Sequence, residues 1–331
     1  MNKLINKVKT TVCYLTLTSS IAIAGTDLPG EGQSITPVFP LNMEERFQGE
    51  IAIAGLEALG YKVNEPKTSE PATMILALGY GDADFTVHLW NSLHNAFYEK
   101  AGGDNTMIKA GGTIPGVLQG YLIDKATSEK YGITSLADFK KPSVANLFDN
   151  DGDGKADLTG CNPGWGCELV IDHHLNAFGL ESTVSHNRGS YFALMADTIT
   201  RFKEGEPIFY YTWVPLWVSG VLKEDQDVVW LEAPYTDLPD GNNNLGTHYN
   251  GKNLGFAVDE VMSVVNKEFA LENPAALSFL SNLRIQSSDI SAQNLKMREG
   301  ENTLADIKNH AAQWVRQNQA VFDEWLELAK Q

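Results

Sequence analysis

Short apolar segments alternate with longer segments of helical periodicity along the first two thirds of the chain. The alternation predicts strands within residues 34–39, 61–63, 84–90, 207–211 and 228–231. It predicts helices within residues 42–59, 71–78, 135–139, 166–178 and 190–205, the first one opened by the N-cap sequence Asn42-Met43-Glu44-Glu45. Strands that alternate with helices in this way are typical of an α/β fold, so we expect a largely parallel sheet.

The last third of the chain is predominantly helical. Asn273-Pro274 is typical of a helix start, and residues 306–330 place large apolar side chains such as Trp314 and Trp325 near one face of a single predicted helix. An amphipathic helix has to bury its apolar stripe, so we expect this tail to fold back on the first part of the chain.

These elements predict two α/β lobes, one of them built from both ends of the chain. We expect residues 25–121 and 232–331 to form the first lobe and residues 122–231 to form the second. Two such lobes suggest a ligand held in a cleft between them, although a fold alone does not establish a function.

The N-terminus has the three features of a secretory signal peptide. Lys3, Lys7 and Lys9 are followed by an apolar, uncharged stretch over residues 11–24 that ends in Ala22-Ile23-Ala24. A basic start, an apolar run and a small-x-small cleavage sequence in this order indicate export. We therefore expect residues 1–24 to be removed, with cleavage near Ala24, and the protein to be exported.

Composition narrows the class of protein. The chain has 331 residues, of which 43% are hydrophobic and 20% are charged, and 42 acidic residues face 25 basic ones, a net charge of −17. Residues 1–24 hold three lysines and no acid, so the chain without them carries −20. The apolar content excludes a wholly disordered chain, and the acidic balance argues against nucleic acid as a partner.

Two cysteines remain after the signal peptide, Cys161 and Cys167, in an oxidising compartment. A disulfide is the expected state, and it would stiffen the loop 162–166 between them. The alternative is a zinc site that also uses His173 and His174. Zinc sites with two cysteines, however, normally have fewer residues between those cysteines.

Trp90, Trp165 and Trp213 lie at strand ends or beside predicted helix starts, where open α/β sheets bind ligands. The face of an indole ring attracts cations and offers no hydrogen bond, which suits a methylated ammonium group. The alternative is that all three tryptophans only pack in the core, as Trp is usually well buried.

The sequence Gly164-Trp165-Gly166-Cys167 indicates a site for an anion. A helix that starts near Gly166 would present free N–H groups and its positive dipole end to an anion. His94 follows Trp90 by four residues, so on a succeeding helix it would share its face and could donate to a carboxylate; the alternative is a capping or surface histidine. Together these residues suit a zwitterion with an ammonium at one end and a carboxylate at the other.

Four segments carry a resemblance to a known family: residues 89–94, 120–125, 161–168 (CNPGWGCE) and 210–215. The chain resembles the periplasmic glycine betaine/proline betaine-binding proteins of osmoprotectant ABC importers along essentially its whole exported length. The resemblance implies the two-lobed type II fold of periplasmic binding proteins. Residues 87–89 and the Asn-rich loop 240–252 depart from the family form, which we expect to affect ligand preference rather than to abolish binding.

The resemblance also implies roles for particular residues. In that family three tryptophans surround the quaternary ammonium, and by match of motif these are Trp90, Trp165 and Trp213. A histidine and two backbone amides hold the carboxylate, which corresponds here to His94, Gly166 and Cys167.

One acidic loop has a pattern of its own. Asp149, Asp151, Asp153 and Asp157 have the spacing of the first ligands of an EF-hand loop, with Gly154 as its glycine, but Gly160 stands where the final bidentate acid belongs. A structural calcium is therefore one interpretation. The other is an Asp/Gly-rich turn whose carboxylates cap their own backbone.

The sequence therefore predicts a periplasmic solute-binding protein, and not an enzyme, since no phosphate-binding loop, zinc-protease motif or nucleophile elbow is present. We expect a monomer that takes glycine betaine or proline betaine to an inner-membrane ABC permease and requires no cofactor. The alternatives are a carrier for choline or carnitine, or a secreted calcium-dependent structural or interaction protein that uses the loop 149–157.

Overall fold

The computed structural model describes residues 28–331. The expected signal peptide, residues 1–24, lies outside the described residues. Within the described part of the chain, no helix is both long enough and apolar enough to span a membrane.

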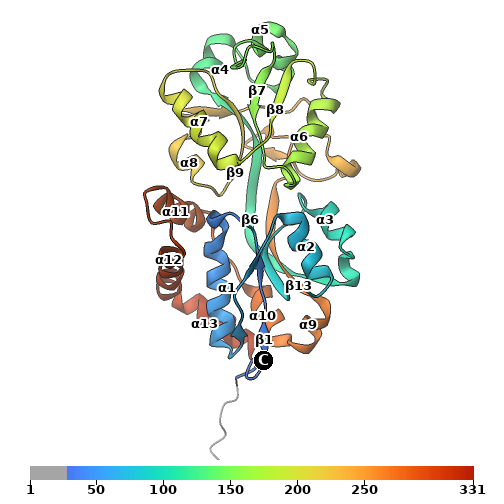
Figure 1. The fold of residues 1–331 in the computed structure, drawn as a ribbon, viewed down its shortest axis with the longest axis vertical. Coiled ribbons are helices and arrows are strands. Elements are labelled where there is room, and N and C mark those ends of the chain that lie inside the picture. Colours follow the sequence, from blue (N-terminus) through green and yellow to red (C-terminus); the bar gives the residue numbers. More distant parts are fainter. Residues whose placement is uncertain (1–27) are drawn as a thin grey trace, which may run out of the picture.

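Two lobes lie one above the other along the long axis of the molecule, and strand β6 (Met107–Asp124) runs through both (Figure 1). The first lobe holds the strands β1 (Ser34–Ile35), β2 (Val38–Phe39), β3 (Lys62–Val63), β4 (Lys67–Thr68), β5 (Phe85–Trp90) and β13 (Asp259–Asn266). Its helices are η1 (Met43–Glu45), α1 (Arg46–Ala58), α2 (Pro71–Gly79), α3 (Asn95–Lys100), η2 (Gly103–Asn105), α9 (Lys267–Glu272), α10 (Pro274–Asn282), α11 (Ser287–Arg298), α12 (Leu304–Gln317) and α13 (Gln319–Ala329).

The second lobe is formed by the middle of the chain. Its strands are β7 (Ala156–Thr159), β8 (Val184–Asn187), β9 (Phe209–Val214), β10 (Val228–Trp230), β11 (His248–Tyr249) and β12 (Lys252–Asn253). Its helices are α4 (Lys125–Tyr131), η3 (Leu136–Lys140), α5 (Pro142–Ala145), α6 (Gly166–Ala177), α7 (Tyr191–Lys203), α8 (Val218–Val221) and η4 (Pro239–Gly241). The predicted helices 71–78, 166–178 and 190–205 are confirmed to within about two residues, the usual uncertainty of helix ends.

The prediction of a largely parallel sheet is wrong for the central sheet, whose strand order is β5-β13-β6-β9-β7-β8 with β10 also paired to β6. Pairs that involve β6 or β13 are antiparallel, and only β7 pairs in parallel, with β8 and β9. The cause is β6 itself, which crosses from one lobe to the other so that β13 and β9 run against it. Glycines and Pro115 interrupt its apolar pattern, and such residues weaken a strand signal.

The strand registers locate the passage between the lobes. β6 pairs with β13 up to Val117 and with β9 from Leu118 onward. The segment after β10 still contacts the second lobe, because the Tyr235 hydroxyl donates to the Ala177 carbonyl at 2.6 Å. We therefore propose that the chain passes between the lobes near residues 117 and 257, and not at residues 121 and 232 as expected.

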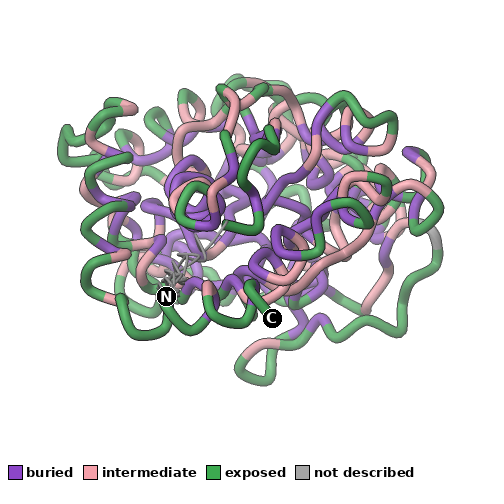
Figure 2. The backbone as a smooth tube through the Cα atoms, turned by 90° about the horizontal axis from the view of Figure 1, so that it is seen from below, coloured by how far each residue is buried: buried purple, intermediate pink, exposed green. Residues whose placement is uncertain are grey.

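The main hydrophobic core extends through both lobes, and a smaller cluster lies beneath α2 and α3. Buried segments run through the interior of the molecule and exposed segments form its periphery (Figure 2).

The C-terminal tail packs on the first lobe beside α1 and α10, as expected (Figure 1). The expected single helix over 306–330 is two helices, α12 and α13, which meet at Asn318. The change of direction lets rings from both helices reach one core: Trp314 stacks on Trp325 with centroids 6.2 Å apart, and Phe322 lies 6.1 Å from Phe279 of α10. Helical periodicity identified the buried stripe but not this break.

Replacing Trp325 by Ala should lower the free energy of unfolding by about 3–5 kcal/mol, because the side chain is 5% exposed and packs on three aromatic rings. Chemical denaturation measures the loss. The exposed neighbour Glu324 provides the control variant E324A, which should unfold like the wild type. Equal stability of W325A and the wild type would contradict the described packing.

Candidate functional site

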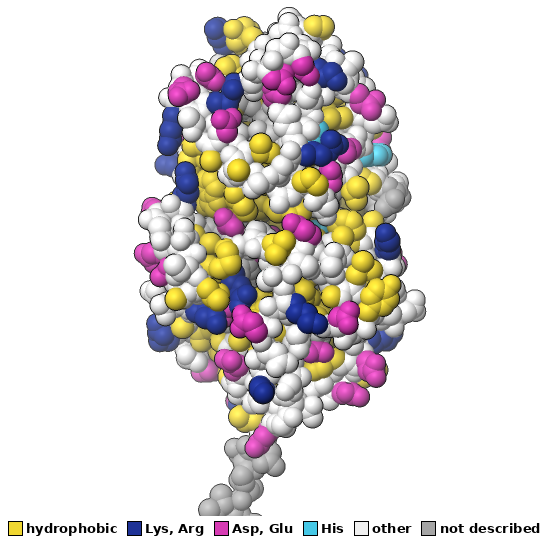
Figure 3. Space-filling model, viewed as in Figure 1, with side chains coloured by type: hydrophobic (Ala, Val, Ile, Leu, Met, Phe, Trp, Pro, Cys, Tyr) yellow, Lys and Arg dark blue, Asp and Glu magenta, His cyan; other side chains and the backbone are white. Residues whose placement is uncertain are grey.

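A small cavity lies between the lobes, and all six expected ligand-binding residues line it: Trp90, His94, Trp165, Gly166, Cys167 and Trp213. The first lobe contributes Trp90 and His94, and the second contributes the other four. In the space-filling view hydrophobic side chains gather along the waist of the molecule where the lobes meet (Figure 3). The cavity is therefore complete only when the lobes are together.

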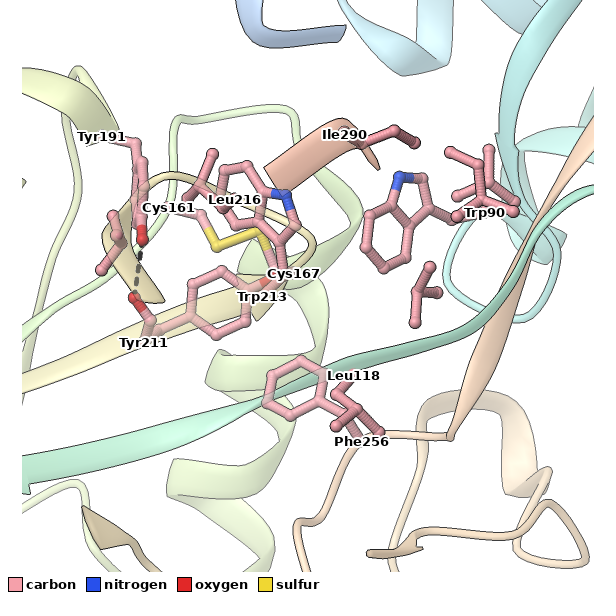
Figure 4. Packing of buried hydrophobic residues seen from close by; sticks show 14 of the residues in the cluster. Trp90, Leu118, Cys161, Cys167, Tyr191, Tyr211, Trp213, Leu216, Phe256 and Ile290 are labelled. Carbon is pink, nitrogen blue, oxygen red and sulfur yellow. Dashed lines mark hydrogen bonds between the residues drawn. A yellow bond between two sulfur atoms is a disulfide. The ribbon is translucent and has the colours of Figure 1, made fainter. Parts of the chain in front are cut away.

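Two of the three tryptophans face each other across this cavity. Trp90 ends β5 and Trp213 lies within β9, and their indole rings point toward one another from opposite lobes (Figure 4). Both are almost fully buried, at 7% and 5% exposure. Tyr191 lies behind Trp213 with the ring centroids 4.8 Å apart, so neighbouring aromatic packing holds the indole in place.

Trp165 completes the aromatic wall and also connects the lobes. It occupies the N-cap position of α6, and its ring meets that of Trp213 edge to face at 5.7 Å. Its indole Nε1–H donates to Oε2 of Glu70, at the start of α2 in the first lobe, over 2.7 Å. The ring orientation is therefore set by both lobes at once.

The anion-binding features predicted for the start of α6 are present. Gly166 and Cys167 are the first residues of this helix, and in residues 28–331 no acceptor is found for either backbone N–H. A helix N-terminus with free N–H groups attracts a carboxylate. Gly166 also faces the other lobe closely, since a Cβ placed on it would lie 2.9 Å from the carbonyl oxygen of Leu93.

His94 lies beside this helix start. The prediction that it lies on a helix face is wrong. Residues 91–94 form turns, and His94 is the N-cap residue of α3. The Trp90 backbone N–H donates to its Nδ1 at 3.3 Å, so the neutral ring carries its proton on Nε2, which is free to donate. Burial lowers the pKa of His94 to about 3, which keeps the imidazole neutral without ligand.

The disulfide between Cys161 and Cys167 is confirmed, and both residues are buried. It ties the loop that carries Trp165 to the first turn of α6, so a ring and two amides are positioned together. The zinc alternative is excluded because both sulfurs are in this bond. Nε2 of His173 instead lies 2.9 Å from Asp237, and Nδ1 of His174 lies 2.8 Å from the Tyr121 hydroxyl.

The structure brings together three of the four acidic residues of the 149–157 loop. Carboxylate oxygens of Asp149, Asp151 and Asp153 lie within 4.8 Å of one another. Asp149 accepts the backbone N–H groups of Gly152, Asp153 and Gly154 at 2.7 to 3.1 Å. These bonds are those of a turn whose carboxylates cap its own backbone.

Asp157 is separate from that group. It lies in β7, where its carboxylate accepts the Asn150 backbone N–H at 2.7 Å and the Asn187 side-chain amide at 2.9 Å. The four residues therefore do not form the single ligand set that their spacing suggested.

Sequence reasoning missed several residues that line the cavity. Glu45 was read only as part of an N-cap, yet Asn42 makes no side-chain cap bond and its amide donates to Oε1 of Glu45 at 3.1 Å. Gln119 and Tyr211 also line the cavity, joined by a bond of 2.7 Å from the Tyr211 hydroxyl to Gln119 Oε1. No sequence motif marked these residues as ligand-binding.

The two segments that depart from the family form lie next to the site. His88 is buried behind Trp90, and its Nε2 bonds the Glu45 carbonyl oxygen at 2.7 Å. Asn242 and Leu245 of the loop 240–252, with Leu238 and Pro239 just before it, line a second cavity. This cavity shares Leu93, Gln119 and Gly166 with the first. Both segments can therefore influence what the cleft accepts.

The geometry provides two complementary ends. Indole faces that make no hydrogen bond to a ligand are suited to a methylated cation, and free backbone amides beside a neutral histidine donor are suited to a carboxylate. The arrangement is therefore suited to binding a zwitterion.

Curated relatives match this chain over nearly the whole of both sequences, and their names describe the same kind of protein. The chain is 47% identical over 317 residues to the "Glycine betaine/proline betaine-binding periplasmic protein" of Escherichia coli K12, with 96% of each chain covered. It is 45% identical over 321 residues to the "Glycine betaine-binding periplasmic protein OusX" of Dickeya dadantii, with 97% of each covered.

Solved structures show the same fold at low identity. Lactococcal OpuAC in its closed-liganded conformation with glycine betaine matches with a TM-score of 0.67 at 18% identity, over 89% of this chain and 99% of that one. An ABC-transporter choline binding protein in complex with choline matches with a TM-score of 0.69 at 19% identity, over 89% and 91%. The fold is the two-lobed type II fold of periplasmic binding proteins.

The family described as "Substrate binding domain of ABC-type glycine betaine transport system" matches residues 35–317, which include every residue of the cavity. A match over most of the chain, together with relatives nearly half identical over its whole length, establishes the relationship. This chain belongs to the family of substrate-binding domains of ABC-type glycine betaine transport systems.

Proposed function

We propose that the protein binds glycine betaine between its lobes and carries it as the soluble component of an ABC importer. The observation that carries this proposal is the convergence of six residues from both lobes on one cavity. Trp90, Trp165 and Trp213 surround the trimethylammonium group. The Gly166 and Cys167 amides and Nε2–H of His94 hold the carboxylate.

The cellular setting follows from the same proposal. The protein is exported, the signal peptide is cleaved near Ala24, and the bound ligand is delivered in the periplasm to an inner-membrane permease. It acts as a monomer and catalyses no reaction itself, since ATP hydrolysis belongs to a separate subunit of such importers. Its relatives named for glycine betaine and proline betaine support this setting.

Proline betaine is the second expected ligand, because it has the same quaternary ammonium and carboxylate. Choline and carnitine are alternatives, since cation–π attraction tolerates different substituents on nitrogen. Choline lacks the carboxylate and would leave the α6 amides without their anion, so we place it below the betaines.

A calcium-dependent structural or interaction role remains the second candidate, supported by the grouping of Asp149, Asp151 and Asp153. Their bonds to their own backbone favour a turn that is stable by itself. We therefore propose that ligand binding needs no metal, and that any calcium in this loop is structural.

Glycine betaine should bind the purified protein with the same dissociation constant in EDTA and in millimolar calcium. Isothermal titration calorimetry measures both values. The reason is that no carboxylate of the acidic loop lines the ligand cavity. Binding that disappears in EDTA would favour the calcium-dependent role, and no binding in either buffer would contradict the proposed function.

Replacing Trp213 by Ala should weaken glycine betaine binding about tenfold or more, because an indole face and its packing are worth about 1–2 kcal/mol to a desolvated cation. W325A is the matched control, since it removes a buried tryptophan outside the cavity and should lower stability without changing affinity. Wild-type affinity in W213A would contradict the aromatic role of this residue.

Replacing Gly166 by Ala should also weaken binding about tenfold or more, because the new methyl group would meet the Leu93 carbonyl and hold the lobes apart. Gly189 offers a control, since a Cβ there meets only ordinary contacts from 3.5 Å. Affinity is measured by calorimetry and lobe closure by small-angle scattering. If G166A binds and closes like G189A, the close approach does not limit closure.

A further inference from the structure

Glu45 lies in the aromatic wall of the cavity without a role in carboxylate capture. It lines the ligand cavity with Trp90 and Trp213, and the same three residues line a smaller void adjoining it. Its backbone carbonyl accepts Nε2–H of His88, and His88 belongs to the strand that ends at Trp90. One strand therefore positions both the indole and the acidic residue.

The carboxyl group of Glu45 has little compensation from the protein. Within residues 28–331 its side-chain hydrogen bond comes from Asn42, a neutral amide. The neighbouring guanidinium of Arg46 pairs with Glu50 instead, with Nε 2.6 Å from its carboxylate. The charged groups that affect Glu45 are two further acids, Glu44 and Glu70. Among the described residues that line this cavity and the adjoining void, none is a lysine or an arginine, so this wall is acidic.

The surroundings of Glu45 disfavour the charged form of its carboxyl group. Removal from water, helped by Glu44 and Glu70 and opposed by the Asn42 bond, raises the pKa of Glu45 to about 7. A fixed positive charge in the cavity would reverse this effect and favour the carboxylate. A quaternary ammonium has no N–H to donate, so it can compensate the carboxylate by its charge alone.

We propose that Glu45 is the counter-charge of the cleft, the residue that selects a cationic head group over a neutral group of the same shape. This inference rests on the proposed function, because it assumes that the cation occupies the tryptophan-lined end of the cavity. The indoles supply shape and a diffuse attraction, and Glu45 supplies a full charge beside them. It touches the ligand as a specificity-determining residue.

The matched ligand pair for the test is glycine betaine and tert-butylacetate. They share a carboxylate and a head group of three methyls, but the central atom of the head is a cationic nitrogen in one and a neutral carbon in the other. Calorimetry near pH 8 gives both affinities for the wild type, E45Q, E45D and the control E57Q, which removes an exposed charge on α1.

E45Q should weaken glycine betaine binding about tenfold and leave tert-butylacetate unchanged or tighter, since it removes attraction for one and repulsion for the other. E45D should retain most of the preference, and E57Q all of it. Equal weakening of both ligands in E45Q would mean that Glu45 is only structural and would overturn the proposal. A wild type that does not bind glycine betaine would instead overturn the proposed function.

The pH dependence supplies a second readout. A bound cation favours the ionised form of Glu45, so a protonated Glu45 has to release its proton when the ligand binds. Wild-type affinity should therefore rise between about pH 5.5 and 8, as a smaller fraction of Glu45 is protonated before binding. His88 and His94 face the same region, but burial lowers the pKa of each to about 3, and bound carboxylate would act on His94 in the opposite direction. In E45Q the rise should be largely lost; an unchanged rise would overturn the proposal.

Discussion

The binding site depends on one close approach between the lobes. The first turn of α6 meets the turn at Leu93 and His94 so closely that position 166 has no room for a Cβ. This approach brings two free amides, a histidine donor and three indoles to one cavity, although they come from different lobes. Under the proposed function, a ligand with opposite charges at its two ends bridges these surfaces and so couples binding to closure.

Preorganisation lowers the cost of that event. The disulfide holds Trp165 to the start of α6, and Tyr191 supports the Trp213 indole from behind. A ring or loop that is already ordered loses less conformational entropy when the ligand arrives, and that entropy would otherwise reduce affinity. The groups that remain uncompensated are of opposite kinds: the free N–H groups of Gly166 and Cys167, and the half-buried carboxyl group of Glu45.

Much of the fold and of the site could be predicted because the signals are local. Helical periodicity over residues 71–78 and 166–178 depends on neighbours within a few residues. The start of α6, with its glycine before the helix and its nearby cysteine pair, is also readable from one short segment. The sheet directions could not be predicted this way, because β6 is interrupted by glycines and its partners are more than eighty residues distant. The break at Asn318 was missed because the apolar stripe continues on both sides of it.

The sequence by itself determined which chemical groups were available: indole faces, a glycine-flanked helix start, a histidine near Trp90 and a short cysteine loop. Residues 1–24 also predict export. Only the tertiary structure decided which groups meet. The backbone of Glu45 is bonded to His88, forty-three residues away, beside the aromatic wall. Asp157 lies apart from the other three acids and accepts bonds from Asn150 of the loop and from Asn187 of the neighbouring strand. The physical reason is that burial, and the charges and hydrogen bonds it brings together, depends on chain segments that local patterns do not relate.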